Sequence, residues 1–202
     1  MASSNKAAET FISVAHVASE LFRAQSIAEE LSITSKNARA LAVRAGSTAA
    51  GFNEITRFIE GLSKLTIDAA RKVNIIAISQ TKIASDLFRS QGFISRLDVV
   101  RNSSADKVNQ LLPIYSEVNH KRTELDKSIS SGLRELVDRL DETKMELRAT
   151  QVVSVVSRVE ASRAHEDFQN SLNSVADKVS SAGQRINKHL ENARRHLAYL
   201  QY

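Results

Sequence analysis

Few side chains in this 202-residue sequence have the types and spacing that metal or catalytic chemistry requires. Glu117 and His120 form an E-x-x-H unit, the unit from which carboxylate metal sites are built in four-helix bundles. Such a site needs a second E-x-x-H and two further inward glutamates, and the sequence contains no second copy. We therefore interpret this unit as the solvated start of a helix after Pro113.

The other candidates for chemistry have simpler explanations. His189 and His196 are seven residues apart and could bind a metal across a bundle, but polar residues in a helix seam are the commoner explanation. Glu29 and Glu30 are most simply explained as adjacent solvent-exposed residues on a helix. The sequence has no cysteine, no glycine-rich phosphate loop and no Ser–His–Asp context. We predict a protein that is not an enzyme, with no catalytic residues, no cofactor and no metal.

The composition favours long helices. Six glycines and one proline in 202 residues leave few turns, and the apolar share of 42% lies mainly in Ala, Val, Ile and Leu. No apolar run approaches the roughly 20 residues that a membrane span needs. The first residues, MASSNKAAET, lack the charged and then apolar segments of a secretion signal, so we expect a cytoplasmic protein. The net charge is +5, but the basic residues are interspersed with acidic ones and no aromatic residues that could stack on bases accompany them. Nucleic-acid binding is therefore not expected.

Apolar residues recur at alternating spacings of three and four, which is typical of a coiled-coil seam. The longest set is Ile59, Leu62, Thr66, Ala69, Val73, Ile76, Gln80, Ile83, Leu87, Ser90, Ile94, Leu97, Arg101, Ser104, Val108 and Leu111. Gln80 and Arg101 are polar at seam positions, where they weaken packing and fix the register. Shorter sets of the same period lie at 7–28, 125–147 and 168–200.

Two interruptions divide these seams. Pro113 lacks an N–H group and disfavours helix at Leu112, and a second break carries Gly46 and Gly51 with small residues between them. The predicted elements are helices over 5–46 and 52–111, a first hairpin over 1–112 with its tip at 46–51, and a second helical segment over 113–202. Because long seams must be buried, the short connection is expected to fold the second helix back antiparallel on the first.

The first tip carries a family resemblance. Residues 37–46 read NARALAVRAG and are followed by Gly51-Phe52, and this pattern resembles the hairpin tip of bacterial methyl-accepting chemotaxis receptors. The resemblance covers roughly residues 27–66. It departs from the family pattern where two tip glutamates are replaced by Leu41 and Phe58, and the family's paired Glu/Gln methylation pattern is not met.

A second, weaker similarity to the same tip pattern lies at residues 158–166, RVEASRAHE. Here Glu160 supplies a glutamate that the first tip lacks, and His165 stands where the pattern has glycine. An unbroken helix from 114 to 200 would be about 130 Å long and would overhang its partners. We therefore predict a second turn near 164–168. The chain would then be an all-α, chemoreceptor-like four-helix bundle of antiparallel coiled-coil hairpins, a receptor-like dimer within one polypeptide.

The resemblance implies a signal-transduction module that acts through protein contacts at its tip, with a chemotaxis histidine kinase or coupling protein as partner and with self-association. A structural or assembly rod without kinase coupling is the alternative. The residues assigned to partner binding are Asn37, Leu41, Arg44, Gly46, Gly51, Phe52 and Phe58 at the first tip, and Glu160 and Arg163 at the second.

Overall fold

Every regular element of the described chain is a helix, which confirms the predicted all-α class. The computed structural model describes residues 2–103 and 108–198. The elements are α1 (Ala2–Ala45), the short 3-10 helix η1 (Gly46–Ala49), α2 (Gly51–Ser103), α3 (Val108–Leu147), α4 (Ala149–Arg163) and α5 (Glu166–Ala198). None of the described helices is apolar over a length that would cross a membrane.

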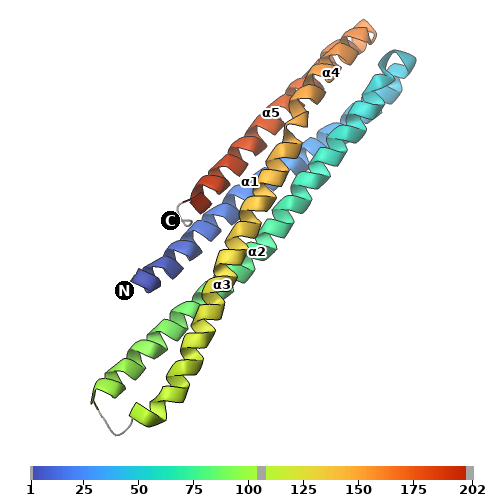
Figure 1. The fold of residues 1–202 in the computed structure, drawn as a ribbon. Coiled ribbons are helices and arrows are strands. Elements are labelled where there is room, and N and C mark those ends of the chain that lie inside the picture. The colour runs from blue at the N-terminus through green and yellow to red at the C-terminus, as the bar shows by residue number, and fades with distance from the viewer. Residues whose placement is uncertain (1, 104–107, 199–202) are drawn as a thin grey trace.

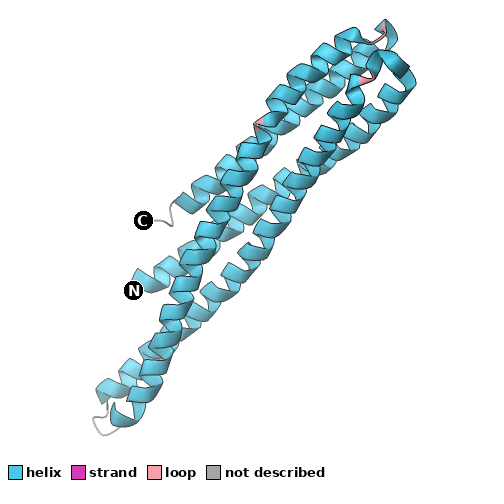
Figure 2. Cartoon of the chain, turned by 45° about the vertical axis from the view of Figure 1, so that its right-hand side comes forward, coloured by secondary structure: helices cyan, strands magenta, loops and turns pink. Residues whose placement is uncertain are grey.

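Long helices lie side by side and run alternately in opposite directions (Figure 1). α1 contacts α2 and α5, while α3 and α4 together form one arm that contacts both α2 and α5. Hydroxyl groups bond across antiparallel neighbours at two places near the turns: the Ser35 hydroxyl donates to the Thr56 carbonyl at 2.6 Å, and the Ser154 hydroxyl donates to the Ala176 carbonyl at 3.2 Å. α2 and α3 extend beyond both chain ends, as Figure 2 shows.

The predicted seams form the core. The largest fully buried side chains come from all four sets and include Leu21, Ile59, Leu87, Leu136, Leu172 and Ile186. Phe11, a member of the set at 7–28, is an exception, because its side chain is largely exposed. It lies near the start of α1, where α2 and α3 continue past the end of α5 and fewer helices surround the seam.

Gln80 shows how a polar seam residue fixes the register. Its side chain is buried, and its amide nitrogen donates to the Ser128 carbonyl at 3.5 Å. Gly132 lies against the same amide, and any side chain at that position would overlap it. If α3 shifted along α2, a residue with a side chain would replace Gly132 opposite the Gln80 amide and would overlap it. This is consistent with the predicted role of Gln80 in fixing the register.

The predicted break at Pro113 is wrong. α2 ends at Ser103 and α3 begins at Val108, so Pro113 lies inside α3 and the predicted division of the chain at 112–113 falls within a helix. Proline cannot supply the N–H that would bond the Asn109 carbonyl and its ring crowds that carbonyl, so α3 continues through Pro113 at the cost of one intrahelical hydrogen bond near its start. The sequence signal that was missed is Asn102-Ser103 at the end of α2, because these residue types favour turns over helix interiors; the seam position Ser104 lies outside the described residues.

A bend at Arg148 divides the long third arm into α3 and α4. The Arg148 N–H donates to the Met145 carbonyl, three residues back, at 3.3 Å. The hydroxyl of Thr150 donates to the Leu147 carbonyl at 2.5 Å and so competes for a backbone acceptor, which is a known cause of helix bending. The heptad pattern did not indicate this bend.

Candidate docking site at the end with both turns

The first turn depends on one glycine. Gly46 has a φ of +69°, the only positive φ among the described residues, and it ends α1 in the left-handed conformation that glycine adopts without strain. η1 follows, and the Thr48 hydroxyl donates to the Ala45 carbonyl at 2.9 Å. α2 then begins at Gly51, so the chain reverses over about the residues that the sequence pattern predicted.

The second turn needs no glycine. α4 ends at Arg163 and α5 begins at Glu166, and Ala164 between them has an extended backbone, with φ −72° and ψ 161°. No described non-glycine residue has a positive φ, so neither Ala164 nor His165 needs the left-handed conformation that favours glycine. The Gln169 amide closes the turn by donating to the Ala164 carbonyl at 2.9 Å. The reversal lies at the start of the predicted segment 164–168.

Both turns lie at the same end of the molecule (Figure 1). η1 contacts α4, and the Glu160 carboxylate occupies the space that a side chain at Gly51 would fill. The Arg163 guanidinium pairs with the Glu160 carboxylate at 2.9 Å. We call residues 44–52 and 160–168 the two-turn end. Glycine at 51 therefore allows close approach of the second hairpin rather than the reversal itself.

Phe52 is corrected from a docking residue to a core residue. Its side chain has 0% exposure and belongs to the same core cluster as the buried Ala49 and Ala164 from the two turns. An aromatic ring at the first turn of α2 points inward because it closes the end of the core between the hairpins. Leu41 is half-buried and packs against this cluster as well.

The remaining predicted docking residues lie on two different sides of the bundle. Asn37 and Arg44 are exposed. Glu30, Asn37 and Arg44 are spaced seven residues apart, so all three lie on one side of α1. Glu30 pairs with Arg185 of α5 at 3.5 Å, so this side faces α5.

Phe58 lies seven residues after Gly51 and therefore shares the side of α2 that meets Glu160 of α4. Its side chain is 42% exposed. The sequence pattern suggested one continuous surface around the first apex. The structure instead separates Phe58, at the α2–α4 edge, from Asn37 and Arg44, at the α1–α5 edge.

Charged side chains at the two-turn end are available to a partner. Arg44 is exposed, and the Arg163 side chain is 68% exposed although it pairs with Glu160. His165 lies 3.2 Å from the Asp167 carboxylate beside it. Exposed guanidinium groups with five donors each suit the recognition of carboxylates on a partner protein.

The candidate metal ligands from the sequence are dispersed. Glu117 is exposed, and His120 pairs with Glu124 at 3.4 Å rather than with a metal-type cluster. The part of the chain that the structure describes contains no group of three or more His, Cys, Asp or Glu placed to hold a metal ion.

The two seam histidines instead join α5 to α1. His189 Nδ1 lies 2.7 Å from the Glu20 carboxylate, and Asn192 donates to the same oxygen at 3.2 Å. Burial alone would raise the pKa of Glu20, but the hydrogen bonds from His189 and Asn192 outweigh it and hold this pKa below its usual value. His196 stacks on His16 with ring centroids 4.7 Å apart. These contacts hold the two helices together well away from the two-turn end.

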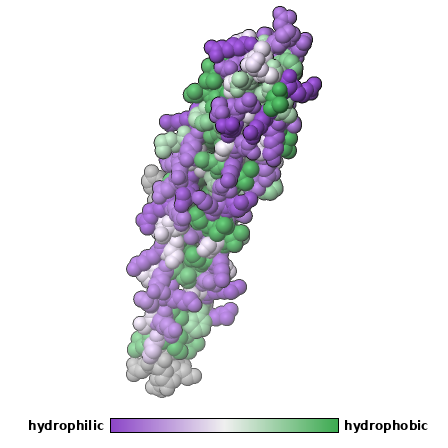
Figure 3. Space-filling model, turned by 90° about the vertical axis from the view of Figure 1, so that its right-hand side faces the viewer, coloured by the Kyte–Doolittle hydropathy of each residue, from purple (hydrophilic) through white to green (hydrophobic). Residues whose placement is uncertain are grey.

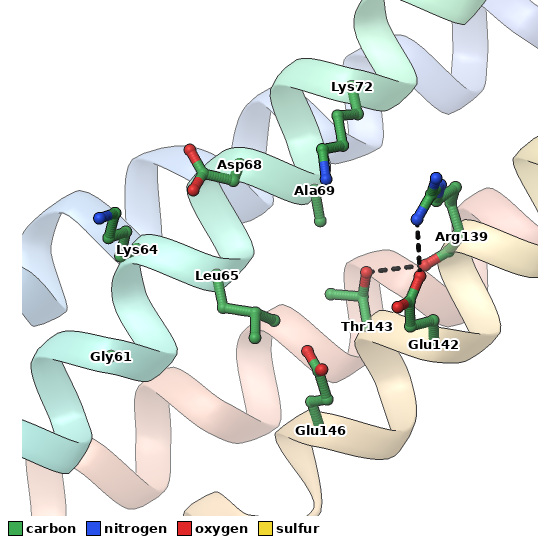
Figure 4. Close-up of a pocket in the computed structure, with 10 residues that line it drawn as sticks. All are labelled: Gly61, Lys64, Leu65, Asp68, Ala69, Lys72, Arg139, Glu142, Thr143 and Glu146. Atoms are coloured by element: carbon green, nitrogen blue, oxygen red, sulfur yellow. Dashed lines mark hydrogen bonds and ion pairs between the residues drawn. The ribbon is translucent and has the colours of Figure 1, made fainter.

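A groove of about 380 Å³ separates α2 and α3 near the middle of the molecule (Figure 4). Leu65 and Ala69 of α2 line it together with lysines on the same helix, while Thr143 and two glutamates line it from α3. Arg139 is held by Glu142 on its own helix at 3.0 Å, and Thr143 donates to the Arg139 carbonyl. The Thr143 hydroxyl is thus bonded to a backbone carbonyl, and the charges of Arg139 and Glu142 are paired within α3.

Comparison of the chain with protein-family models, with curated proteins and with solved structures finds no match. The resemblance to chemotaxis receptors therefore stays a prediction from the tip residues.

Proposed function

We propose that the chain is a four-helix bundle that acts as a chemoreceptor-like signal-transduction module and docks partner proteins through its two-turn end. The observation that carries the proposal is the position of the two turns. Glu160 of one hairpin packs against Gly51 of the other, so a single polypeptide presents two tips side by side, as a dimer of receptor hairpins would.

The proposed partner is a protein such as a chemotaxis histidine kinase or coupling protein. Arg44 and Arg163 supply the exposed cationic groups at the tips, and Asn37 adds an amide at the α1–α5 edge. Phe58 offers a partly exposed aromatic side chain at the other edge, and aromatic and arginine residues are the types that dominate protein contacts.

The test compares partner capture by the native chain and by tip variants. Arg44→Glu and Arg163→Glu should each abolish capture of a coupling protein or kinase from the native cell. The unfolding temperature should stay nearly unchanged for Arg44→Glu, because Arg44 is exposed, and should fall for Arg163→Glu, because its partner Glu160 is only 20% exposed and would lose its cation. Arg71→Glu is the matched control, since Arg71 is 67% exposed and also pairs with an acidic residue three positions away, but lies far from the turns.

Capture that is equally strong for the wild-type chain and for both tip variants would contradict docking at this end. Loss of capture by the Arg71 variant as well would show that charge in general, rather than the two-turn end, attracts the partner.

A structural rod without kinase coupling is the second candidate, and the exposed apolar side chains favour it. α2 exposes Ile75 and Ile78 near its middle and Phe88 and Phe93 toward Ser103, where fewer helices surround it. On the face shown in Figure 3, apolar areas recur along the length of the molecule among polar ones. A rod that assembles through its sides would keep associating when the two-turn end is mutated, which separates the two candidates.

A further inference from the structure

α4 has its apolar face turned toward solvent. Its buried residues are Thr150, Ser154, Ser157 and Ala161, which are small or polar. Its exposed residues include Val152, Val155, Val156 and Val159, with exposures from 44% to 65%. A helix that packs on a core normally shows the opposite arrangement.

The helix geometry places the most exposed valines opposite the buried face, while Val153 on the flank is partly buried against the core. At 100° per residue, Val152 and Val159 point about 180° away from the centre of the buried face formed by Ser154 and Ser157. Close packing accounts for the small inward residues, because Thr150 lies against Gly183 of α5. Packing within the chain gives no reason for the outward valines.

The outward valines have the spacing of a coiled-coil seam. Val152 and Val159 are seven residues apart, Val156 lies between them, and Met145 continues the line seven residues earlier with 66% exposure. We call Met145, Val152, Val155, Val156 and Val159 the valine stripe. A line of this kind fits another helix lying along it.

The charges at the two ends of the valine stripe are opposite. Arg163 follows Val159 by four residues and lies on the same side of α4, and its side chain is 68% exposed. Asp141 precedes Met145 by four residues on the continuing face of α3, and its carboxylate is 43% exposed although it pairs with Arg194 of α5. The stripe is therefore basic at one end and acidic at the other.

These charges suit an antiparallel copy of the same stripe. If a two-fold axis passes beside Val152 of both chains, the numbers of any two facing residues add up to twice 152, which is 304. Val159 of one chain then faces Met145 of the other, and Arg163 faces Asp141. The valines and Met145 then cover one another, the exposed Arg148 within the same face meets Val156, and each basic end meets an acidic end. A parallel arrangement would instead place Arg163 opposite Arg163.

We propose that the valine stripe is a homodimer interface in which two copies of the chain pair antiparallel about Val152. The interface shares Arg163 with the two-turn end, but its apolar residues lie outside that end, and it does not depend on the proposed signalling function. Because the axis lies about 17 Å from the end of α4 at Arg163, the two-turn ends of the two copies would point in opposite directions, about 33 Å apart, within the length of the dimer rather than at its ends.

Sedimentation of the full chain over a wide concentration range tests the association. The wild-type chain should reach twice the mass of one chain, and Val152→Glu should raise the dissociation constant at least about tenfold because two carboxylates would meet at the axis. Ile33→Glu is the matched control, since Ile33 is also an exposed β-branched residue but lies on α1. It should dimerise like the wild type.

Cysteine cross-linking tests the register, because the chain has no native cysteine. Val152→Cys should cross-link to itself with a short thiol-reactive linker. Met145→Cys and Val159→Cys should each fail to cross-link alone and should cross-link when the two variants are mixed.

Three outcomes would overturn the proposal: a wild-type chain that stays monomeric at every concentration, dimerisation that Val152→Glu leaves unchanged, or self-cross-linking of Met145→Cys alone. Circular dichroism of each variant confirms that the helices are retained, so that loss of dimer cannot be attributed to unfolding. Loss of dimer in Val152→Glu with partner capture unchanged would support the dimer and separate it from docking. Arg44→Glu tests docking without changing the dimer interface, whereas Arg163→Glu changes both surfaces.

Discussion

Phe52→Ala is expected to lower the free energy of unfolding by about 3–5 kcal/mol, whereas Phe58→Ala costs less than about 1 kcal/mol. The two phenylalanines lie six residues apart on α2, but Phe52 is fully buried between the two hairpins and Phe58 is 42% exposed. Removing the buried ring leaves a cavity among Ala49, Ala164 and their neighbours in the core cluster. Denaturant unfolding followed by circular dichroism at one fixed protein concentration measures both costs.

The pair of variants also tests the assignment of the docking residues. An equal, large loss of stability for both would place Phe58 in the core and remove it from the docking surface. A negligible loss for Phe52→Ala would contradict the packing of the two hairpins against each other at the two-turn end.

Gly183→Ala is expected to destabilise the protein by about 1–3 kcal/mol, because an added methyl group overlaps the facing helix. A Cβ at Gly183 would lie 2.6 Å from Thr150 Oγ1 and 2.9 Å from Thr150 Cβ, and a β-branched side chain on a helix cannot move aside freely. α4 and α5 would have to separate along the contact where the Ser154 hydroxyl bonds the Ala176 carbonyl.

Gly92→Ala is the matched control for Gly183→Ala. Gly92 is also helical, but nothing lies within 4 Å of the position that its Cβ would take, so alanine should raise stability by about 0.5–1 kcal/mol. Thermal unfolding of the two variants should shift in opposite directions. The cost of Gly183→Ala should shrink when Thr150 is also alanine, because two of the three close atoms are then gone; an unchanged cost would contradict the close contact.

The helical class and the seams could be predicted because they depend on periodicity. A three-and-four spacing over some fifty residues has few physical interpretations besides a buried helix face, and Ile59, Val73 and Leu87 are buried as expected. The first turn was also predictable, because Gly46 is the residue type that a left-handed helix end requires.

The rest depended on contacts between distant segments. Proline strongly indicates a helix end, yet Pro113 lies so near the start of α3 that the helix accommodates it. Neither the burial of Phe52 nor the separation of Phe58 from Arg44 can be derived from one helix, since both depend on where α4 and α5 pack. The valine stripe was missed for the same reason: a Val-rich run reads as core until the structure shows which face is inward.

The distance between the two turns tests the central claim most directly. Spin labels at cysteines introduced in place of Ser47 and His165, both exposed, should lie within about 20 Å, roughly two helix diameters, if both hairpins end together. Labelled chains diluted with an excess of unlabelled chain report only distances within one molecule. A separation above about 40 Å, as a straight helix through the region of residue 165 would give, would contradict the two-turn end and the docking function proposed for it.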